Sequence, residues 1–460
     1  MDLYSRIVEG VYACAGRLTA NNAWQIFCEI QKAEIRSLAE IESLQWNRVK
    51  AHISFAYEHV EMYRSLWKAL DIHPEDISSR NDLMNIPVVS KQTLVEQPME
   101  KKLAYGNLSS GLVPVHTSGT TGQPLQVFMD SEGYNQQYAN LLYGYYLTGW
   151  RLGKKMITVR NYSHGDYENR YSPSGLAHEP FPLLRKLVYR LFHRKRFLPP
   201  LQKGMQPDEK MLEDAVREIQ QTAPYFLEGN GYFWYLLARY VKENGIKIPS
   251  VGAAEIDEVP LAASQKKVIE EAFNCKTYDV YGSHELGVVA HECSAGMGNH
   301  ILSLSYNVEI LEEHSDKEVA PGSIGRVVVT DLTNRVTPLI RYDTGDLATR
   351  ISKPCSCGRA FPLMGHIEGR MINSVMINGT RYTERFFQDI IFGFEDVIGF
   401  QINREDEGSD NIKVSLLTRS DGLKEKVAEA LKNAVGCSVK VETVNNIDLE
   451  KSGKARWVKL

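Results

Sequence analysis

The sequence has little cysteine and no long apolar run. Seven cysteines are scattered through 460 residues, which is too few for a disulfide-stabilised scaffold in a chain of this length. No apolar run reaches the roughly 18 residues that a transmembrane helix needs. The first residues include Asp2 and Glu9 and lack a basic stretch followed by an apolar core. We therefore expect no signal peptide, no transmembrane segment and a cytoplasmic location.

An excess of charge of either sign is also absent. The chain carries 53 Lys and Arg residues against 57 Asp and Glu residues, a formal charge of -4, which argues against a general nucleic-acid-binding protein. Hydrophobic residues make up 43% and charged residues 24%, as in ordinary globular proteins. The length predicts more than one domain, at roughly 100–200 residues per domain.

The residue pattern predicts layers of helices and strands. Residues 1–70 have apolar residues at helical spacing, and Ser90 is expected to cap a further helix. From about residue 113 onward, short apolar strands alternate with helical segments, which predicts an α/β fold. The predicted strands are 156–160, 277–281, 288–290 and 324–330, the last with a partner at 338–342, and the predicted helices are 208–222 and 261–273.

A break at about 352–374 separates a small C-terminal unit. Strands are predicted at 397–403, 412–418 and 438–444. Between the last two strands, Asp421 is expected to cap a helix whose apolar face carries Leu423, Val427, Leu431 and Val435. We therefore expect a large multi-layer α/β domain over 1–369 and a small, mobile α+β domain over 370–460.

The segment HTSGTTGQP (116–124) is the first strong indication of function. It concentrates hydroxyl groups and glycines, whose unshielded backbone N–H groups can wrap a polyphosphate. Taken alone, such a segment is also typical of an ordinary loop. The candidate phosphate-binding residues are Thr117, Ser118, Gly119, Thr120, Thr121 and Gly122.

Further segments follow this loop in a fixed order: YDVYGSHELG (278–287), IRYDTGDL (340–347), GR (369–370) and SGK (452–454). This series resembles the adenylate-forming superfamily, which includes acyl-CoA synthetases and luciferases. Within it, the chain is most similar to the phenylacetate–CoA ligase-like and CapK-like branch. Three features carry that resemblance: Leu125 at the position of the usual lysine, CSCGR (355–359), and YR (63–64) followed by NIPVVSK (85–91).

The resemblance implies a role for each matching residue. Residues 117–122 would hold the β- and γ-phosphates of ATP, and Glu285 would help to hold Mg²⁺. Asp346 would bind the ribose hydroxyls, with Arg370 nearby, and Lys454 would neutralise charge on the transferring α-phosphate. Ala254 and Glu255 would line the adenine pocket, with Tyr281 stacking on the base.

The implied reaction has two steps. A carboxylate attacks the α-phosphorus of ATP and gives an acyl-adenylate and pyrophosphate; a rotation of the C-terminal domain then admits coenzyme A. We expect an aryl acid as substrate and a monomer or homodimer. The alternative is transfer of the acyl or adenylyl group to an amine, a sugar amine or a carrier thiol in a polysaccharide or natural-product pathway. A non-catalytic ATP-binding scaffold is a third hypothesis, because MINS (371–374) departs from the usual hinge and Leu125 replaces the usual lysine.

The acyl pocket is expected to be aromatic. An aromatic lining would suit a ring or a hydrophobic acyl chain, although such residues are also common in ordinary cores. His284 would orient the substrate carboxylate or act as a neutral neighbour. The candidates for the pocket itself are Tyr162, Tyr225, Phe226, Gly229, Tyr232 and Phe233.

The cysteines suggest a separate metal site. Cys293, Cys355, Cys357 and His300 supply three thiolates and an imidazole, a ligand set that suits tetrahedral Zn²⁺. Such an ion would be structural, with His291 as the rival fourth ligand; reduced thiols in a loop are the alternative. Cys14, Cys28, Cys275 and Cys437 are expected to pack as small hydrophobic side chains.

One basic segment interrupts the balanced charge. Residues 185–196 carry seven Arg, Lys and His side chains and no acid. The segment is either a solvated helix face or a site for a phosphorylated or membrane-bound partner. Peripheral membrane contact through 185–196 follows from the second hypothesis.

Overall fold

The computed structural model describes residues 3–18, 21–117, 124–160, 194–199, 207–404, 410–420, 422–447 and 456–459. No helix within these ranges combines the length and the apolar character that a membrane crossing requires. The helices are α1 (Leu3–Leu18), α2 (Ala23–Ala33), α3 (Leu38–His59), α4 (Glu61–Ala69), α5 (Lys91–Glu96), α6 (Met99–Lys102), α7 (Ser131–Leu147), α10 (Glu209–Thr222), α11 (Gly231–Glu243), α12 (Ala263–Phe273), α13 (Glu384–Ile391) and α14 (Leu423–Val435), with a 3₁₀ turn η4 (Met371–Asn373).

The strands confirm the expected α/β class and the small C-terminal sheet. Their bounds are β1 (Val89–Ser90), β2 (Val113–His116), β3 (Gln126–Met129), β4 (Met156–Val159), β5 (Lys195–Phe197), β6 (Phe226–Asn230), β7 (Ala253–Asp257), β8 (Lys276–Ser283), β9 (Gly287–Glu292), β10 (Asn299–Ile301), β11 (Tyr306–Leu311), β12 (Ile324–Asp331), β13 (Tyr342–Arg350), β14 (Leu363–Arg370), β15 (Val375–Ile377), β16 (Thr380–Tyr382), β17 (Val397–Arg404), β18 (Ile412–Thr418) and β19 (Val439–Thr443).

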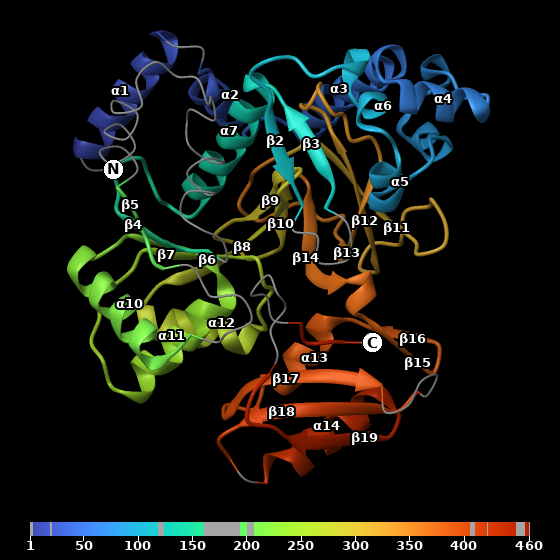
Figure 1. Ribbon diagram of the computed structural model, residues 1–460. Helices are drawn as coiled ribbons and strands as arrows, with labels where there is room; N and C mark the ends of the chain where they lie inside the picture. Colours follow the sequence, from blue (N-terminus) through green and yellow to red (C-terminus); the bar gives the residue numbers. More distant parts are fainter. Residues whose placement is uncertain are drawn as a thin grey trace.

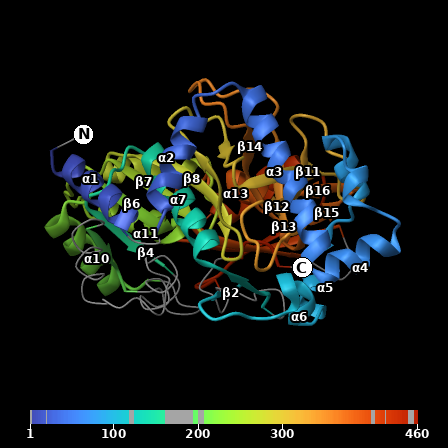
Figure 2. The same ribbon diagram turned by 90° about the horizontal axis from the view of Figure 1, so that it is seen from above.

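Two of the N-terminal helices begin at capping residues. Ser37 and Glu40 form a reciprocal capping box at the start of α3, and Ser90 caps α5 by accepting from the backbone N–H of Thr93, as predicted. Seen from above, α3 to α6 gather at the β11–β13 side of the molecule, whereas α1, α2 and α7 lie at the β4–β8 side (Figure 2).

A twelve-stranded mixed sheet organises the large part of the chain. Its order is β11-β12-β13-β14-β10-β9-β8-β7-β6-β4-β5, with β1 paired to β13. Neighbours from β5 to β8 are parallel, whereas β8 and β9 run antiparallel. The turn after β8 therefore lies at a change of direction in the sheet, close to the carboxyl ends of the parallel strands, where ligands bind in open α/β sheets.

The parallel strands are buried on both faces. Phe226 and Ala253 pack in one core cluster with residues of α7. Leu227, Ala254 and Ile256 belong to a second cluster with α11 and α12. This alternation places α7 on one side of the strands and α10 to α12 on the other (Figure 1).

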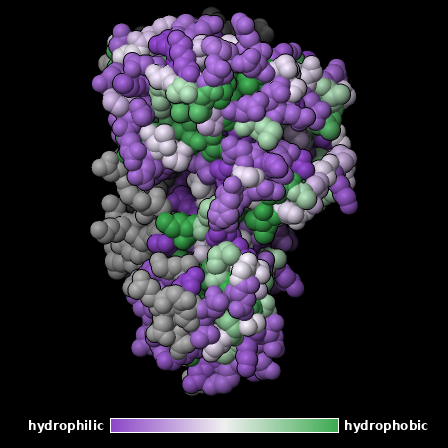
Figure 3. Space-filling view, turned by 90° about the vertical axis from the view of Figure 1, so that its right-hand side faces the viewer, coloured by the Kyte–Doolittle hydropathy of each residue, from purple (hydrophilic) through white to green (hydrophobic). Residues whose placement is uncertain are grey.

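The C-terminal part forms two small sheets, β15-β16 and β17-β18-β19, with α13 and α14. Leu423, Val427, Leu431 and Val435 are buried on α14, as predicted. Asp421 lies outside the described residues, and Gly422 occupies the position before the helix. The domain boundary at 369/370 stays a prediction. Figure 3 shows a largely hydrophilic face that is hollowed between the larger part above and the C-terminal domain below.

Two predictions from the sequence are wrong in detail. The strand β12 pairs with β11 and β13, and β13 begins only at Tyr342, because Arg341 adopts a left-handed backbone conformation with φ of 45°. Residues 338–341 therefore form no strand. Among the four cysteines expected to pack as hydrophobic residues, Cys14 is exposed, whereas Cys28, Cys275 and Cys437 are half-buried and pack against the cores as predicted.

A pH dependence of stability is expected from Asp331. This side chain is fully buried; its Oδ1 accepts from the N–H and hydroxyl of Thr333, and its Oδ2 has no partner in the described part of the chain. Burial raises the pKa of Asp331 to about 6. Because the folded-state pKa of Asp331 exceeds its unfolded value, this side chain stabilises the folded state below about pH 4. The stabilisation is lost as the pH rises through 6.

The test is urea unfolding of the wild type and Asp331→Asn between pH 4 and 7. Relative to the variant, the wild type should lose about 2–3 kcal/mol of unfolding free energy across this window. A difference that stays constant with pH would contradict the assignment.

Candidate active site

A cavity of about 1220 Å³ lies between the large sheet and the C-terminal domain. Residues of β7, β8, β13, β14 and α5 form one wall, and residues of α13 and the C-terminal tail face them. Its charged lining residues include Lys91, Arg160, Glu255, Asp257, Glu258, Asp279, Glu285, Asp343, Asp346, Arg370, Glu384, Arg385 and Arg456. Such convergence of charge predicts a site for a charged ligand rather than a purely apolar one.

Glu285 sits in the short turn between β8 and β9. Gly287 begins β9 with φ of 74°, and a Cβ there would come within 2.9 Å of the Gln137 side chain, so this position requires glycine. The turn leaves Glu285 only 6% exposed but lining the cavity. The Tyr342 hydroxyl donates to its Oε1 over 3.1 Å; burial and this carboxylate raise the pKa of Tyr342.

The base of the hydroxyl-rich loop reaches the same turn. The N–H of Leu125 donates to the Thr117 hydroxyl oxygen, and the N–H of Thr117 donates to the Leu125 carbonyl. Nδ1 of His284 lies 3.1 Å from the carbonyl oxygen of His116, which joins the β2 strand to the Glu285 turn. Thr117 and His284 both line the cavity; Ser118, Gly119, Thr120, Thr121 and Gly122 lie outside the described residues.

Tyr281, Asp346 and Arg370 meet at the cavity wall. The Tyr281 hydroxyl lies 3.0 Å from Oδ2 of Asp346 and 3.1 Å from the hydroxyl of Thr344. Arg370 Nε is 3.6 Å from Oδ1 of Asp346, and the two residues are paired across β13 and β14. The geometry brings the three candidates together; their roles toward base and ribose stay predictions.

The two adenine-pocket candidates differ in position. Ala254 is fully buried in the core of the sheet and is absent from the cavity lining, whereas Glu255 lines it. Oε2 of Glu255 lies 2.7 Å from Nε2 of His291, and both residues are 1% exposed. Burial opposes protonation of His291, but the hydrogen bond and charge of Glu255 raise its pKa above the ordinary value.

The C-terminal tail runs to the cavity. Lys454 lies outside the described residues, but Arg456, two residues later, lines the cavity. The Trp457 N–H donates to Oε1 of Glu384, and Val458 bridges to Ile402. The chain on the C-terminal side of Lys454 is therefore anchored at the site.

The described aromatic residues proposed for an acyl pocket do not line this cavity, and their role stays a prediction. Tyr225 stacks beneath the Lys154 ammonium group, and Phe226 and Phe233 are fully buried in the two cores. Tyr232 faces the C-terminal domain, where its hydroxyl donates to the Ile398 carbonyl over 3.2 Å. These residues do not line the cavity.

Gly229 and Tyr162 complete that set. Gly229 is also absent from the cavity lining; a Cβ there would clash with the Val159 backbone, so it serves the close pairing of β4 and β6. Tyr162 lies outside the described residues. Aromatic composition alone could not separate pocket from core, because α11 uses its rings for packing.

Part of the basic segment is buried rather than solvated. Only residues 194–196 of it lie within the described ranges. The side chain of Lys195 is 3% exposed and lies 2.5 Å from Oε2 of Glu228, which also pairs with Arg160. Burial lowers the pKa of Lys195 to about 8, although Glu228 opposes the shift. The burial of Lys195 therefore contradicts both hypotheses for this residue, the solvated helix face and the surface docking site.

Sequence reasoning missed several lining residues. Lys91 follows directly after Ser90 at the start of α5, and Asp343 lies three residues before Asp346. Both belong to segments that carry the family resemblance, so those segments held the available signal. Asp279 likewise belongs to the segment 278–287, whereas Arg160 had no such signal, because its partners Glu228 and Asp257 come from distant parts of the chain.

The predicted zinc ligands converge. The four ligand atoms of Cys293, His300, Cys355 and Cys357 all lie within 4.8 Å of one another. Sγ of Cys293 and Cys355 are 3.6 Å apart, and Sγ of Cys357 is 3.3 Å from Nε2 of His300. Tetrahedral zinc with bonds of about 2.3 Å places its thiolates about 3.8 Å apart. These four residues can therefore hold a zinc ion.

The surroundings of the cluster fit a structural ion. Nδ1 of His300 lies 2.9 Å from the Phe361 carbonyl, the kind of second contact that leaves Nε2 for a metal. His291 cannot be the fourth ligand, because its nitrogens face Glu255 and the Glu292 carbonyl. A bound ion would join the β9–β10 hairpin to the segment before β14.

Known proteins are similar to the chain over most of its length. A phenylacetate–coenzyme A ligase of Thermus thermophilus is 26% identical over 435 residues, covering 87% of this chain and 92% of that protein. Protein CapK of Staphylococcus aureus is 22% identical over 447 residues, covering 92% and 90%. No protein-family model matches the chain.

Solved structures share the fold. A 2-hydroxyisobutyryl-CoA ligase in the postadenylation state, in complex with R3-HIB-AMP, superposes with a TM-score of 0.75 at 18% identity. The match covers 93% of this chain and 91% of that one, so both the large sheet and the C-terminal domain have counterparts there.

Protein purified without a histidine tag is expected to contain about one zinc ion per chain by elemental analysis. Cys355→Ser removes one of the buried thiolates and should lower the zinc content severalfold and reduce the melting temperature, because the ion cross-links distant segments. Cys14→Ser, at an exposed thiol outside the cluster, should change neither quantity. Zinc well below one per chain in the wild type would rule out the site.

Proposed function

We propose that the chain, which is similar over most of its length to phenylacetate–CoA ligases and to CapK, is an adenylate-forming enzyme that activates a carboxylic acid with ATP and passes the acyl group to coenzyme A. One observation carries this proposal: Glu285, Asp346, Tyr281 and Arg370 come from three separate motif segments and face one cavity. Their chemistry suits a nucleotide with its metal ion, which is the reagent that adenylation requires.

Each residue then has a distinct task. Asp346 accepts hydrogen bonds from the ribose hydroxyls, and Arg370 offsets its charge. Residues 117–122 wrap the β- and γ-phosphates with backbone N–H groups and hydroxyls. Lys454 is carried to the α-phosphate by the tail that Arg456 and Trp457 anchor at the cavity. Catalysis consists mainly of positioning and charge stabilisation.

The magnesium assignment fits the residues present. Glu285 offers a carboxylate whose Oε1 accepts from the Tyr342 hydroxyl, and magnesium prefers oxygen ligands of this kind. When bound, the ion supplies positive charge that offsets the phosphates. Glu285 holds it, and the short β8–β9 turn keeps that carboxylate in place.

Coenzyme A transfer would use a rotation of residues 370–460 against 1–369. Residues 371–373 form the turn η4 between the large sheet and β15 and line the cavity. Ile372 is 56% exposed there, so little packing restrains this turn. Contacts such as Tyr235 and Arg239 with the Val397 carbonyl hold the arrangement described.

The acid itself is proposed only by class. Because the described aromatic candidates lie outside the cavity, an aryl acid has no support from them. The cavity wall combines apolar residues such as Val280, Val288 and Ile367 with charged ones. A screen should therefore include aryl, aliphatic and amino acids on equal terms.

The test is ATP–pyrophosphate exchange across such a panel of acids. An active acid should promote exchange, and added coenzyme A should give a thioester; exchange without a thioester would favour another acceptor. Lys454→Ala should slow exchange about 100- to 1000-fold, as expected for loss of a transition-state donor. Lys451→Ala, in the same tail, is the matched control and should retain activity.

Glu285→Gln gives an independent test of the magnesium assignment. It should raise the magnesium concentration needed for half-maximal exchange, because the amide is a poorer ligand than the carboxylate. Unchanged exchange in Lys454→Ala would refute the role of the lysine. Absence of both exchange and ATP binding in the wild type would refute the proposed function.

A further inference from the structure

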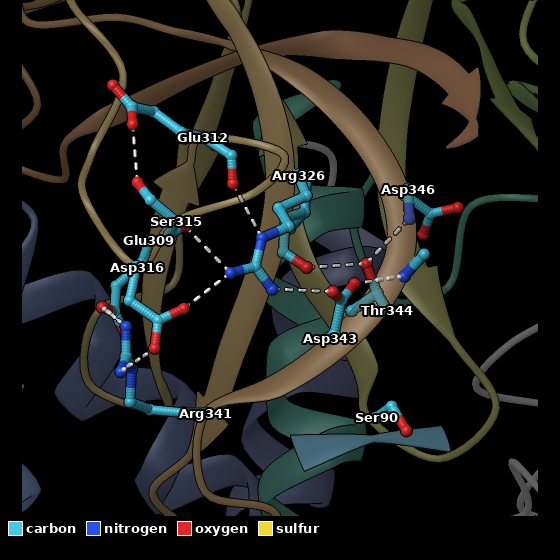
Figure 4. A network of polar contacts seen from close by, with 12 residues as sticks. Ser90, Glu309, Glu312, Ser315, Asp316, Arg326, Arg341, Asp343, Thr344 and Asp346 are labelled. Atoms are coloured by element: carbon cyan, nitrogen blue, oxygen red, sulfur yellow. Dashed lines mark hydrogen bonds and ion pairs between the residues drawn. The ribbon is translucent and has the colours of Figure 1, made fainter. Parts of the chain in front are cut away.

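Arg326 lies outside the cavity but contacts the segment that forms its wall. Its side chain is 11% exposed, and Nη1 donates to Oδ2 of Asp343 over 3.0 Å. Nη2 donates to Oδ1 of Asp316 over 2.6 Å and to the Ser315 carbonyl, and Nε donates to the Glu312 carbonyl (Figure 4). All three guanidinium nitrogens are thus engaged, which makes the orientation of this side chain rigid.

The partner Asp343 controls a local irregularity. The pairing of β12 with β13 shifts between Arg326 and Val328, so the residues after Asp343 bulge out of the ladder. Oδ1 of Asp343 accepts from the N–H of Gly345 over 2.9 Å, and Gly345 has φ of 75°. One carboxylate therefore binds both the arginine and the turn of the bulge.

Thr344 completes the bulge and connects it to Asp346. Its hydroxyl donates to the Val327 carbonyl over 3.0 Å, and the N–H of Asp346 donates to the same hydroxyl oxygen over 3.2 Å. Tyr281 contacts both Thr344 and Asp346. The direction of the Asp346 carboxylate consequently depends on the shape of the bulge.

Charge makes this arrangement dependent on Arg326. Asp343 and Asp346 both line the cavity three residues apart, and Asp316 faces Asp343 through the guanidinium (Figure 4). Without the arginine, these carboxylates would repel one another in a partly buried site. Asp343 would then lose the partner that fixes it against Gly345.

We propose that Arg326 is a positioning residue of the nucleotide site: through Asp343 it shapes the bulge 343–346 and so aims the Asp346 carboxylate at the ribose hydroxyls. This inference rests on the proposed function, because it requires ATP in the cavity. Arg326 does not itself line the cavity; it acts only through Asp343.

The test compares two nucleotides rather than activity alone. Binding of Mg–ATP and Mg–2′,3′-dideoxy-ATP is measured by calorimetry for the wild type and Arg326→Met. The wild type should prefer ATP, because only ATP offers the hydroxyls that Asp346 accepts from. Arg326→Met should bind ATP about tenfold more weakly and the dideoxy nucleotide nearly as well as the wild type does. Arg326→Lys should restore part of the preference.

A matched control is available on the neighbouring strand. Arg350 pairs with Glu318 over 2.6 Å on the exposed side of β13, and Arg350→Met should leave both affinities unchanged. Asp343→Asn should reproduce the loss of preference, and its combination with Arg326→Met should add little, because both act through one contact.

The outcomes separate the two hypotheses. A wild type that binds no ATP overturns the proposed function, and this inference with it. A wild type that prefers ATP, together with an Arg326→Met variant of unchanged preference, overturns the positioning role alone. Equal weakening of both nucleotides in Arg326→Met would also overturn it, since that pattern reflects general damage to the fold.

Discussion

The buried guanidinium of Arg341 connects the N-terminal helical part of the chain to the sheet that carries the candidate site. The residue is fully buried, and its side chain donates to both carboxylate oxygens of Glu309 and to the Ile86 carbonyl, with Asp316 nearby (Figure 4). A buried charge of this kind is tolerated only when its donors find acceptors. These contacts therefore determine where the segment after β11, the chain before β1 and the start of β13 lie relative to one another.

Strand β13, whose start is fixed by these contacts, carries several residues of the candidate site. Tyr342 reaches Glu285, Asp343 reaches Arg326, and Asp346 reaches Tyr281 and Arg370. Asp316 is shared by Arg326 and Arg341, so the two arginines form one network behind the cavity. The ribose-binding candidate Asp346 thus lies on a strand whose start is held by a buried ion pair and whose bulge is held by partly buried ones.

The C-terminal domain is joined to the large part by packing as well as by polar contacts. Trp457 packs against Tyr232 and Phe400, and Tyr235 packs against Phe392. The aromatic face of α11 therefore supports the domain that carries the C-terminal tail. Of the rings expected around a substrate, Tyr232 lies at this contact between α11 and the C-terminal domain.

Local chemistry was sufficient to predict much of the structure from the sequence. Ser90 caps α5 and the apolar face of α14 is buried because each effect acts within a few residues. The order of the motif segments likewise identified the residues that meet at the cavity, and the CXC pair with Cys293 and His300 identified the thiol cluster.

Tertiary structure alone decided which distant groups face one another. His291 turns to Glu255, Lys195 is buried against Glu228, and Arg326 is paired with Asp343, because burial and charge compensation act between segments that the linear sequence separates.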